Sequence, residues 1–199
     1  MNKCDVYSFY DEGYSVGLTP SEVYRHGIEY IEQHEDFNGF CEAFDVEDYY
    51  TELMFERYTY DRAPLQLKYM AQAFLSSGYL KPLQEKLIRS QHKDQSWTKR
   101  IVPISYSCFD RRTSLPPHSD SAESADFFCL FYFTQNNWKP EWGGKVTLGH
   151  ENGKVFWEHL PYDQSFLMIN SQNPLFCHSV SEVTEDVPRK VISISFRIE

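Results

Sequence analysis

The sequence lacks paired cysteine motifs, long apolar runs and a recognisable targeting segment. Its five cysteines are odd in number and share no CxxC spacing, so neither a disulfide framework nor a zinc ribbon is expected. No stretch approaches the ~20 apolar residues that a membrane-spanning helix needs, and residues 1–7 lack the apolar region of a secretory signal. We therefore expect a cytoplasmic protein that does not contact a membrane.

Basic residues are also scarce. The chain has 19 Lys and Arg against 29 Asp and Glu, a formal charge of −10, which argues against a nucleic-acid partner because phosphate binding needs concentrated positive charge. The pair Arg111-Arg112 fits a solvated turn or a weak attraction for an anionic ligand. At 199 residues, without repeats or low-complexity tracts, the chain is predicted to form one domain, residues 1–199.

The first hundred residues favour helices that support the rest of the chain. Thr19-Pro-Ser-Glu22 has the pattern of a helix cap and first turn. An early strand is possible around Cys4 to Tyr10. The segments with long apolar and charged side chains at helical intervals are Val23–Gln33, Asp45–Tyr58, Pro64–Ser76 and Leu80–Gln91.

From residue 101 onward the pattern changes to strands. Short segments rich in β-branched and aromatic residues alternate with turn residues. These segments are Ile101–Tyr106, Phe127–Phe133, Gly144–Leu148, Lys154–Trp157, Ser165–Asn170 and Lys190–Arg197. Several short strands after a helical prefix predict an α+β protein with a mainly β core, a two-sheet sandwich or barrel in residues 101–199 supported by residues 1–100.

Three residues in this β region form a candidate metal-binding set. His118 and Asp120 stand two positions apart, so both can reach one metal from an extended segment while the residue between them points away. His178 follows a predicted buried strand and a turn-like segment and supplies a third ligand. Two imidazoles and one carboxylate are the set that holds non-haem iron(II) and leaves one face of the metal open.

Two further residues predict an anion site beside the metal. Arg189 opens the last predicted strand, where a fixed guanidinium can hold a carboxylate through two hydrogen bonds. Ser193 lies four residues later, on the same face of a strand. Arg197 and Arg100 are the alternative anchors. A lone His-x-Asp pair arises often by chance, whereas this ordered set is far more specific.

With these residues in place, the second half of the chain resembles the iron- and 2-oxoglutarate-dependent dioxygenases, prolyl-hydroxylase-like branch. The resemblance includes the strand, tryptophan and paired-glycine segment, and the third ligand with its basic partner. It implies a double-stranded β-helix, or jelly roll, with Fe(II) at His118, Asp120 and His178. The segments that carry it are Phe131–Trp138, Glu141–Gly144, His178–Val180 and Arg189.

The resemblance also implies a co-substrate site. Arg189, supported by Ser193, would pair with the distal carboxylate of 2-oxoglutarate, and Tyr106 matches a position where the family often has a co-substrate-binding tyrosine. Phe133 stands where some relatives have a second tyrosine, and Tyr132 is expected to point to the opposite face.

The family chemistry implies that O2 and 2-oxoglutarate are consumed and that succinate and CO2 are released. Asp120 favours hydroxylation, because related halogenases have a small residue at that position. We expect hydroxylation of an unactivated carbon in a small amino-acid-like or peptide substrate, and a protein side chain is the alternative. Desaturation, epoxidation and ring closure use the same oxidant. The rival classes are a non-catalytic jelly-roll metal-binding module and a cupin-type isomerase or hydrolase.

Other features are open to simpler interpretations. Ser121–Asp126 and Tyr49–Arg62 are candidate substrate-rim segments or ordinary solvated connections. Gly143-Gly144 fits a turn more readily than a close backbone approach. His150 and His159 flank a predicted hairpin turn and are expected at the surface rather than at the metal.

Overall fold

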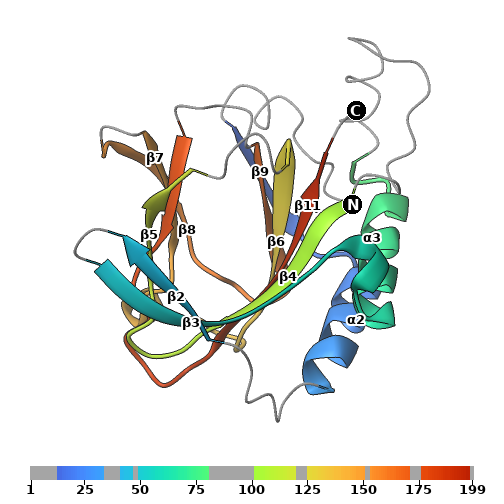
Figure 1. The fold of residues 1–199 in the computed structure, drawn as a ribbon, viewed down its shortest axis with the longest axis horizontal. Helices are drawn as coiled ribbons and strands as arrows, with labels where there is room; N and C mark the ends of the chain where they lie inside the picture. Colours follow the sequence, from blue (N-terminus) through green and yellow to red (C-terminus); the bar gives the residue numbers. More distant parts are fainter. Residues whose placement is uncertain are drawn as a thin grey trace.

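A computed structural model describes residues 13–33, 41–46, 49–80, 101–119, 125–150, 153–170 and 176–197. These residues form two antiparallel sheets that face each other, and two helices cover the outer face of the larger sheet (Figure 1). This is the jelly-roll arrangement predicted for residues 101–199, extended by strands from the first hundred residues. Among the described residues, no helix is long and apolar enough to cross a membrane.

The larger sheet has seven strands in the order β1-β9-β6-β11-β4-β3-β2. The smaller sheet has the order β5-β10-β7-β8. The bounds in the larger sheet are β1 Tyr14–Leu18, β2 Cys41–Val46, β3 Tyr49–Tyr58, β4 Ile101–Phe109, β6 Phe127–Phe133, β9 Ser165–Asn170 and β11 Arg189–Phe196. Those in the smaller sheet are β5 Leu115–His118, β7 Val146–His150, β8 Val155–His159 and β10 Phe176–Val180.

The central strand β6 of the larger sheet is apolar on both faces. Six of the seven residues of β6 are buried, which explains its continuous apolar sequence, because a strand covered on both sides need not alternate with polar residues. One face of this sheet packs on the helices through a cluster that includes Ile192 and Phe131. The other face meets the smaller sheet through a cluster that includes Val191 and Leu148.

The helices are α2, Ser21–Glu32, and α3, Leu65–Ser76. Each begins directly after a proline, Pro20 or Pro64, which fixes an extended entry into the first turn. Phe74 of α3 is fully buried and makes edge contacts with Phe131 and Phe166 of the larger sheet. Two 3-10 turns, Tyr60–Arg62 and Pro140–Trp142, complete the described helical structure.

Several predicted elements are confirmed. The helix over Val23–Gln33 corresponds to α2, and that over Pro64–Ser76 to α3. All six predicted strands are present, and β6 and β9 have the predicted bounds.

The helix predicted over Asp45–Tyr58 is wrong, because these residues contribute to the hairpin formed by β2 and β3, and β3 also pairs with β4. The predictions missed β1, β5 and β10 as strands. The predicted segment at Cys4–Tyr10, and all but the first residue of Leu80–Gln91, lie outside the described residues.

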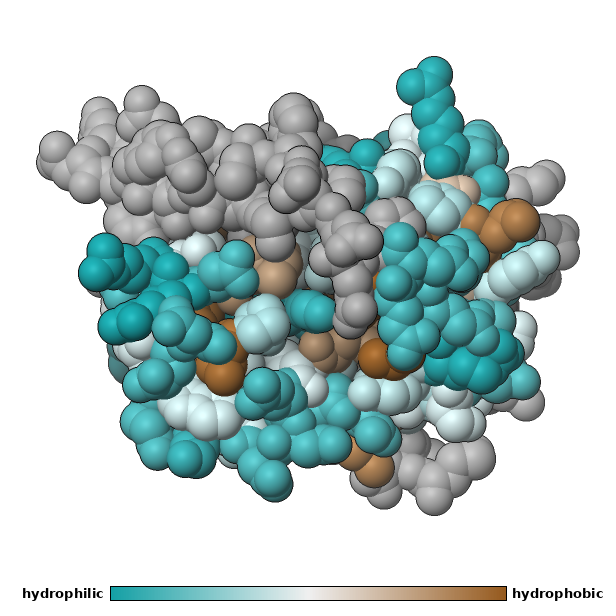
Figure 2. Space-filling view, turned by 90° about the horizontal axis from the view of Figure 1, so that it is seen from below, coloured by the Kyte–Doolittle hydropathy of each residue, from teal (hydrophilic) through white to brown (hydrophobic). Residues whose placement is uncertain are grey.

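The face seen in Figure 2 carries mainly hydrophilic residues, and its apolar residues occur as separate spots. The two large apolar clusters of the described chain lie in the interior, between the two sheets and beneath the helices.

Candidate active site

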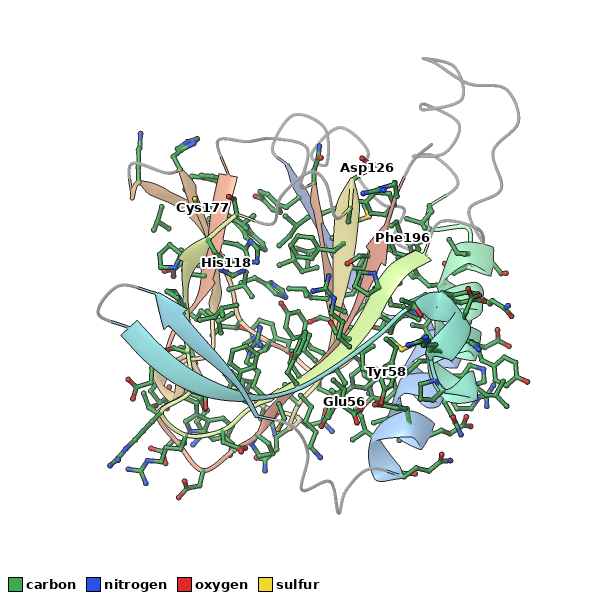
Figure 3. The ribbon with its side chains drawn as sticks, viewed as in Figure 1. Glu56, Tyr58, His118, Asp126, Cys177 and Phe196 are labelled. Carbon is green, nitrogen blue, oxygen red and sulfur yellow. The ribbon has the colours of Figure 1, made fainter. Side chains whose placement is uncertain are left out.

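Neighbouring strands of the smaller sheet bring two of the predicted metal ligands together. His118 ends β5, and its Cα is paired directly with that of His178 in β10. The two imidazole centroids are 4.1 Å apart. β5 has the sequence Leu-Pro-Pro-His, and its place at the edge of the sheet permits the two prolines, which offer no backbone N–H. Figure 3 shows His118 turned toward the space between the sheets.

The local contacts of His118 leave one ring nitrogen available. Its Nδ1 lies 2.8 Å from the carbonyl oxygen of Pro116. A carbonyl only accepts hydrogen bonds, so Nδ1 carries the proton and Nε2 keeps its lone pair. Burial, reinforced by the neighbouring His118, lowers the pKa of His178 well below its usual value. The lowered pKa favours the neutral ring of His178, and Nε2 of His118 is free of a described partner, so both side chains fit the donor set of an iron(II) site.

The third predicted ligand, Asp120, lies outside the described residues. Within the part of the chain that the structure describes, no group of three His, Cys, Asp or Glu side chains is close enough to hold a metal. The structure therefore confirms the approach of His118 to His178, and Asp120 remains a prediction.

A cavity of about 360 Å³ lies between the sheets and is bordered by both histidines. Its described wall contains two arginines, Arg57 and Arg189, and no Asp or Glu. The volume is within the usual range for small-molecule sites, ~300–1,000 Å³. Four serines add hydroxyl groups from the larger sheet: Ser105, Ser107, Ser193 and Ser195.

Arg189 lines this cavity and is only 1 % exposed. Its Nε donates a hydrogen bond of 2.9 Å to the carbonyl oxygen of Gly144. Its guanidinium carbon lies 4.5 Å from the ring centroid of Phe109 and 5.3 Å from that of Tyr132. Burial lowers the pKa of Arg189, yet an arginine side chain stays charged in a protein. No described carboxylate forms an ion pair with it, so the arrangement favours a bound anion.

Tyr132 is the aromatic hydroxyl beside this cation, contrary to the sequence prediction. It is paired across the sheet with Val191, a residue of the cavity wall, so it faces the cavity side. Phe133 faces the helices and stacks on Tyr24 at 5.3 Å. The Tyr132 hydroxyl is buried and has no hydrogen-bond partner of ordinary geometry among the described residues. Burial raises the pKa of Tyr132 to about 12, although the adjacent guanidinium opposes the shift.

The prediction that Tyr106 contacts the co-substrate is also wrong. Its neighbours on β4, Ser105 and Ser107, line the cavity, and alternate residues of a strand face opposite sides. Tyr106 instead packs in the helix-side core, with its ring 5.8 Å from that of Tyr30 and nearly perpendicular to it.

Ser193 lies where the sequence placed it, on the same face of β11 as Arg189 and in the cavity wall. Its hydroxyl oxygen is 2.6 Å from that of Ser105 on the adjacent strand. Of the alternative anchors, Arg197 is not in the cavity wall, and Arg100 lies outside the described residues.

The paired glycines have a packing role that the turn interpretation missed. Both have positive φ, +70° at Gly143 and +66° at Gly144, where glycine avoids the strain of a side chain. A Cβ on Gly144 would lie 3.0 Å from Cδ of Arg189 and 3.2 Å from Trp138. The absent side chain therefore lets the backbone approach the arginine whose Nε it binds.

His159 is half-buried behind the anion site, although the sequence predicts a surface position for it. Its ring is 5.6 Å from that of Tyr132 and stacks on Trp157 at 5.4 Å. Burial, with a further effect of the Arg189 charge, lowers the pKa of His159 to about 4. The imidazole is therefore neutral at physiological pH and adds no positive charge beside the guanidinium.

Sequence reasoning missed Tyr132, Phe109 and Gly144 as neighbours of Arg189. The sequence does show that Tyr132 and Phe133 face opposite sides of β6, but it does not show which side meets the cavity. The contact of Gly144 with Arg189 joins residues 45 positions apart and has no local signature.

Comparisons with known proteins agree with this site. Residues 104–197, just under half of the chain, match the model of the 2OG-Fe(II) oxygenase superfamily. No curated protein sequence matches the chain.

Solved structures share the fold at low sequence identity. A Pseudomonas putida prolyl-4-hydroxylase is 12 % identical, with a TM-score of 0.66 and 97 % of each chain covered. A Trichoplax adhaerens prolyl hydroxylase, solved with a hypoxia inducible factor peptide fragment, is 14 % identical, with a TM-score of 0.63, 96 % of this chain and 86 % of that chain covered. A Phytophthora capsici prolyl 4-hydroxylase is 17 % identical, with a TM-score of 0.63, 96 % of this chain and 61 % of that chain covered.

The family match, the jelly roll and the facing histidines beside a buried arginine lead to one assignment. The family uses iron(II), 2-oxoglutarate and dioxygen. Residues 104–197 therefore correspond to a 2OG-Fe(II) oxygenase domain, the domain of a non-haem iron, 2-oxoglutarate-dependent dioxygenase.

Proposed function

We propose that the enzyme hydroxylates an unactivated carbon of a small amino-acid-like or peptide substrate, with succinate and CO2 as co-products. The observation that carries this proposal is the buried Arg189, which pairs with no described carboxylate and lies in the wall of the cavity that His118 and His178 also border. The Trichoplax relative was solved with a peptide, and the cavity of about 360 Å³ suits a substrate of side-chain size.

In this proposal His118, Asp120 and His178 hold the iron. The iron supplies the site at which dioxygen is activated when 2-oxoglutarate is bound. Arg189 binds the distal carboxylate of 2-oxoglutarate, and the buried Tyr132 hydroxyl, which has no hydrogen bond of ordinary geometry among the described residues, donates a second hydrogen bond to it. The Ser193 hydroxyl supports the same carboxylate from the cavity wall.

The aromatic rings around Arg189 have a separate role. Phe109 and Tyr132 cover the guanidinium and keep water from it. A charge-assisted pair is stronger in such surroundings than in water. The chain thus contributes a dry, preformed anion site, so that the co-substrate is oriented before dioxygen arrives.

The direct test is uncoupled turnover. Protein purified without oxygen should bind iron(II) and 2-oxoglutarate and give a weak visible charge-transfer band, and should release succinate once oxygen is admitted. Well-folded, iron-loaded protein that shows neither band nor succinate would refute the proposal.

Two variants separate the roles within the site. His178→Ala should lose iron, because two remaining ligands hold a labile metal poorly. Arg189→Gln should keep iron but weaken 2-oxoglutarate binding by about 2–5 kcal/mol, the typical cost of removing one partner of a desolvated charge pair. Iron content by metal analysis and 2-oxoglutarate affinity by calorimetry measure the two effects independently. Normal co-substrate affinity in Arg189→Gln would assign the anchor to another residue.

A further inference from the structure

The cavity contains a second arginine that the co-substrate site does not use. Arg57 lies on β3 and lines the cavity wall. It is exposed, unlike Arg189, so it stands at the mouth of the cavity. No described carboxylate forms an ion pair with Arg57.

Strand alternation turns Arg57 toward the cavity. Its neighbours Glu56 and Tyr58 face the helix side, where the Tyr30 hydroxyl donates a hydrogen bond to Glu56, and Figure 3 shows both on that side of β3. The one acidic neighbour of Arg57 along the described part of β3 therefore points away from it, and the cation remains available to a ligand.

The position of Arg57 follows a row of paired residues across three strands. Arg57 is paired with Ser105, and Ser105 with Ser193. Arg189 is four residues from Ser193, so the Cα atoms of the two arginines are separated by two strand spacings and four residues, roughly 16 Å. A five-carbon dicarboxylate anchored at Arg189 and chelated by the metal does not extend to the β3 side of the cavity as well. Arg57 is thus left for a second molecule.

The chemistry around Arg57 favours an anion. The described cavity wall contains no Asp or Glu, although acidic residues outnumber basic ones by ten in the whole chain. Ser105 and Ser107 supply hydroxyls on the adjacent strand, and a hydroxyl can donate to a carboxylate oxygen while accepting another hydrogen bond. A guanidinium with flanking hydroxyl donors is a carboxylate-binding arrangement.

We propose that Arg57 binds a carboxylate of the substrate, so that the substrate class is a small amino-acid-like carboxylic acid. This inference rests on the proposed function, because it assigns 2-oxoglutarate to Arg189 and the remaining part of the cavity to the substrate. The carboxylate is held at the cavity mouth, and the carbon to be oxidised extends inward past the serines toward His118 and His178.

The probes for the test are matched pairs that differ by one negative charge: N-acetyl amino acids and the corresponding N-acetyl amino acid amides. The enzyme with iron(II) and 2-oxoglutarate should release succinate faster with at least one acid than with its amide. Calorimetric titration of the same pairs should show tighter binding of the acid, and this measurement requires no turnover.

Variants assign the effect to Arg57. Arg57→Gln should raise the KM for the stimulating acid about tenfold, in the range for loss of a hydrogen-bonded charge, and should abolish the preference over the amide. Arg57→Lys should keep part of the preference, since the charge remains. Arg62→Gln removes an exposed arginine of the nearby 3-10 turn, which is not in the cavity wall, and should not alter the preference.

The possible failures are distinguishable. Absence of 2-oxoglutarate binding and of succinate release refutes the proposed function. Normal 2-oxoglutarate turnover with equal response to acids and amides, or with response to neither, overturns the role of Arg57. An Arg57→Gln variant whose KM for 2-oxoglutarate rises as strongly as that of Arg189→Gln also overturns it, because Arg57 then belongs to the co-substrate site.

Discussion

At the scale of single residues, Gly144 supports the anion site without contacting the ligand. Its carbonyl oxygen accepts the Arg189 Nε hydrogen bond, and a Cβ there would crowd Arg189, Trp138 and Val183 at 3.0 to 3.3 Å. Gly144→Ala should therefore displace the guanidinium and weaken 2-oxoglutarate binding roughly tenfold, because a charge pair in a desolvated site depends on its geometry. Calorimetric titration with iron(II) present measures the effect.

The matched control is Gly153→Ala. Gly153 also has positive φ, +81°, but a Cβ there would meet nothing within 4 Å. Both substitutions incur the backbone cost of a side chain in the left-handed region, about 1–2 kcal/mol, and only Gly144→Ala disturbs Arg189. Equal loss of 2-oxoglutarate affinity in both variants would show that crowding at Arg189 is not the cause.

His159 gives a prediction about pH. Its pKa is lowered to about 4 in the folded protein, whereas the unfolded chain should have the ordinary value near 6.5. As pH falls below 6.5 the unfolded state binds the proton first, so stability present above pH 6.5 is lost progressively down to pH 4.

Between pH 7.5 and pH 5 this loss should reach up to about 2 kcal/mol. His159→Gln removes the titrating group and should show a smaller loss over the same interval in urea unfolding. Equal pH dependence in the two proteins would exclude His159 as the source, because all other titrating groups are shared.

The limits of sequence reasoning are clear at this scale. Arg189 and Ser193 were placed together correctly because both lie on one strand, where spacing alone fixes the shared face. The face of Tyr132 is hard to predict because β6 is buried on both sides and has no polar alternation to mark the cavity face. Tyr106 does lie between two serines on β4, but serines on one face of a strand do not by themselves show whether that face borders a cavity or solvent. That choice depends on how whole sheets pack.

At the scale of elements, α2 is seated on the larger sheet through a glycine. A Cβ on Gly27 would lie 2.1 Å from the ring of Phe133. Helix propensity alone predicts that Gly27→Ala stabilises the protein by about 1 kcal/mol. The clash should dominate, and the variant should lose about 1–3 kcal/mol, the usual cost of overpacking.

A double-mutant cycle in urea unfolding tests this contact. Phe133→Leu replaces the ring by a shorter side chain and should relieve much of the cost of Gly27→Ala. The expected coupling energy is at least 0.5 kcal/mol. Additive effects, or a more stable Gly27→Ala protein, would contradict the packing of α2 on β6.

The described residues between 45 and 58 form strands where the sequence predicts a helix. Leu53, Met54 and Glu52 are good helix formers, and their mixture of apolar and charged residues fits a helix locally. Yet this part of β3 pairs with β2 on one side, and the end of the strand pairs with β4 on the other. β2 precedes β3 directly, whereas β4 lies more than forty residues further along the chain. Pairing with both strands overrides the weak local preference for a helix. As a strand of this hairpin, β3 places Arg57 in the cavity wall.

At the scale of the whole molecule, the site requires both sheets. The histidines come from the smaller sheet and the arginines and serines from the larger one. A ligand that spans them should stabilise the packing of one sheet on the other. Iron(II) with 2-oxoglutarate should therefore raise the Tm. The free energy of unfolding should increase by about 2.7 kcal/mol when the ligand is at 100 times its Kd.

Thermal unfolding with and without the ligands measures this effect, and a chelator should reverse it. Arg189→Gln is the comparison, since its Tm should respond to iron but little to 2-oxoglutarate. An equal rise on adding 2-oxoglutarate to both proteins would place the stabilising contact elsewhere.

The oxygenase domain covers residues 104–197, but the fold predicts that this half does not suffice. β1 pairs with β9, and α2 and α3 cover the opposite face of the larger sheet from the cavity. The helix side chains Val23, Tyr30, Leu67, Met70 and Phe74 are all fully buried. Burial of such a side chain contributes about 1.5–3 kcal/mol, so their total is of the same order as the ~5–15 kcal/mol stability of a whole domain.

Residues 101–199 expressed alone should therefore lack a cooperative unfolding transition and should self-associate through the uncovered face that includes Phe131 and Ile192. Size-exclusion chromatography and circular dichroism, with the full chain as reference, measure both properties. We predict one cooperative domain over residues 1–199. A monomeric fragment that melts sharply and binds 2-oxoglutarate with the affinity of the full chain would contradict this prediction. Since the helices bury only the face away from the cavity, that outcome would show that the two sheets hold the site by themselves.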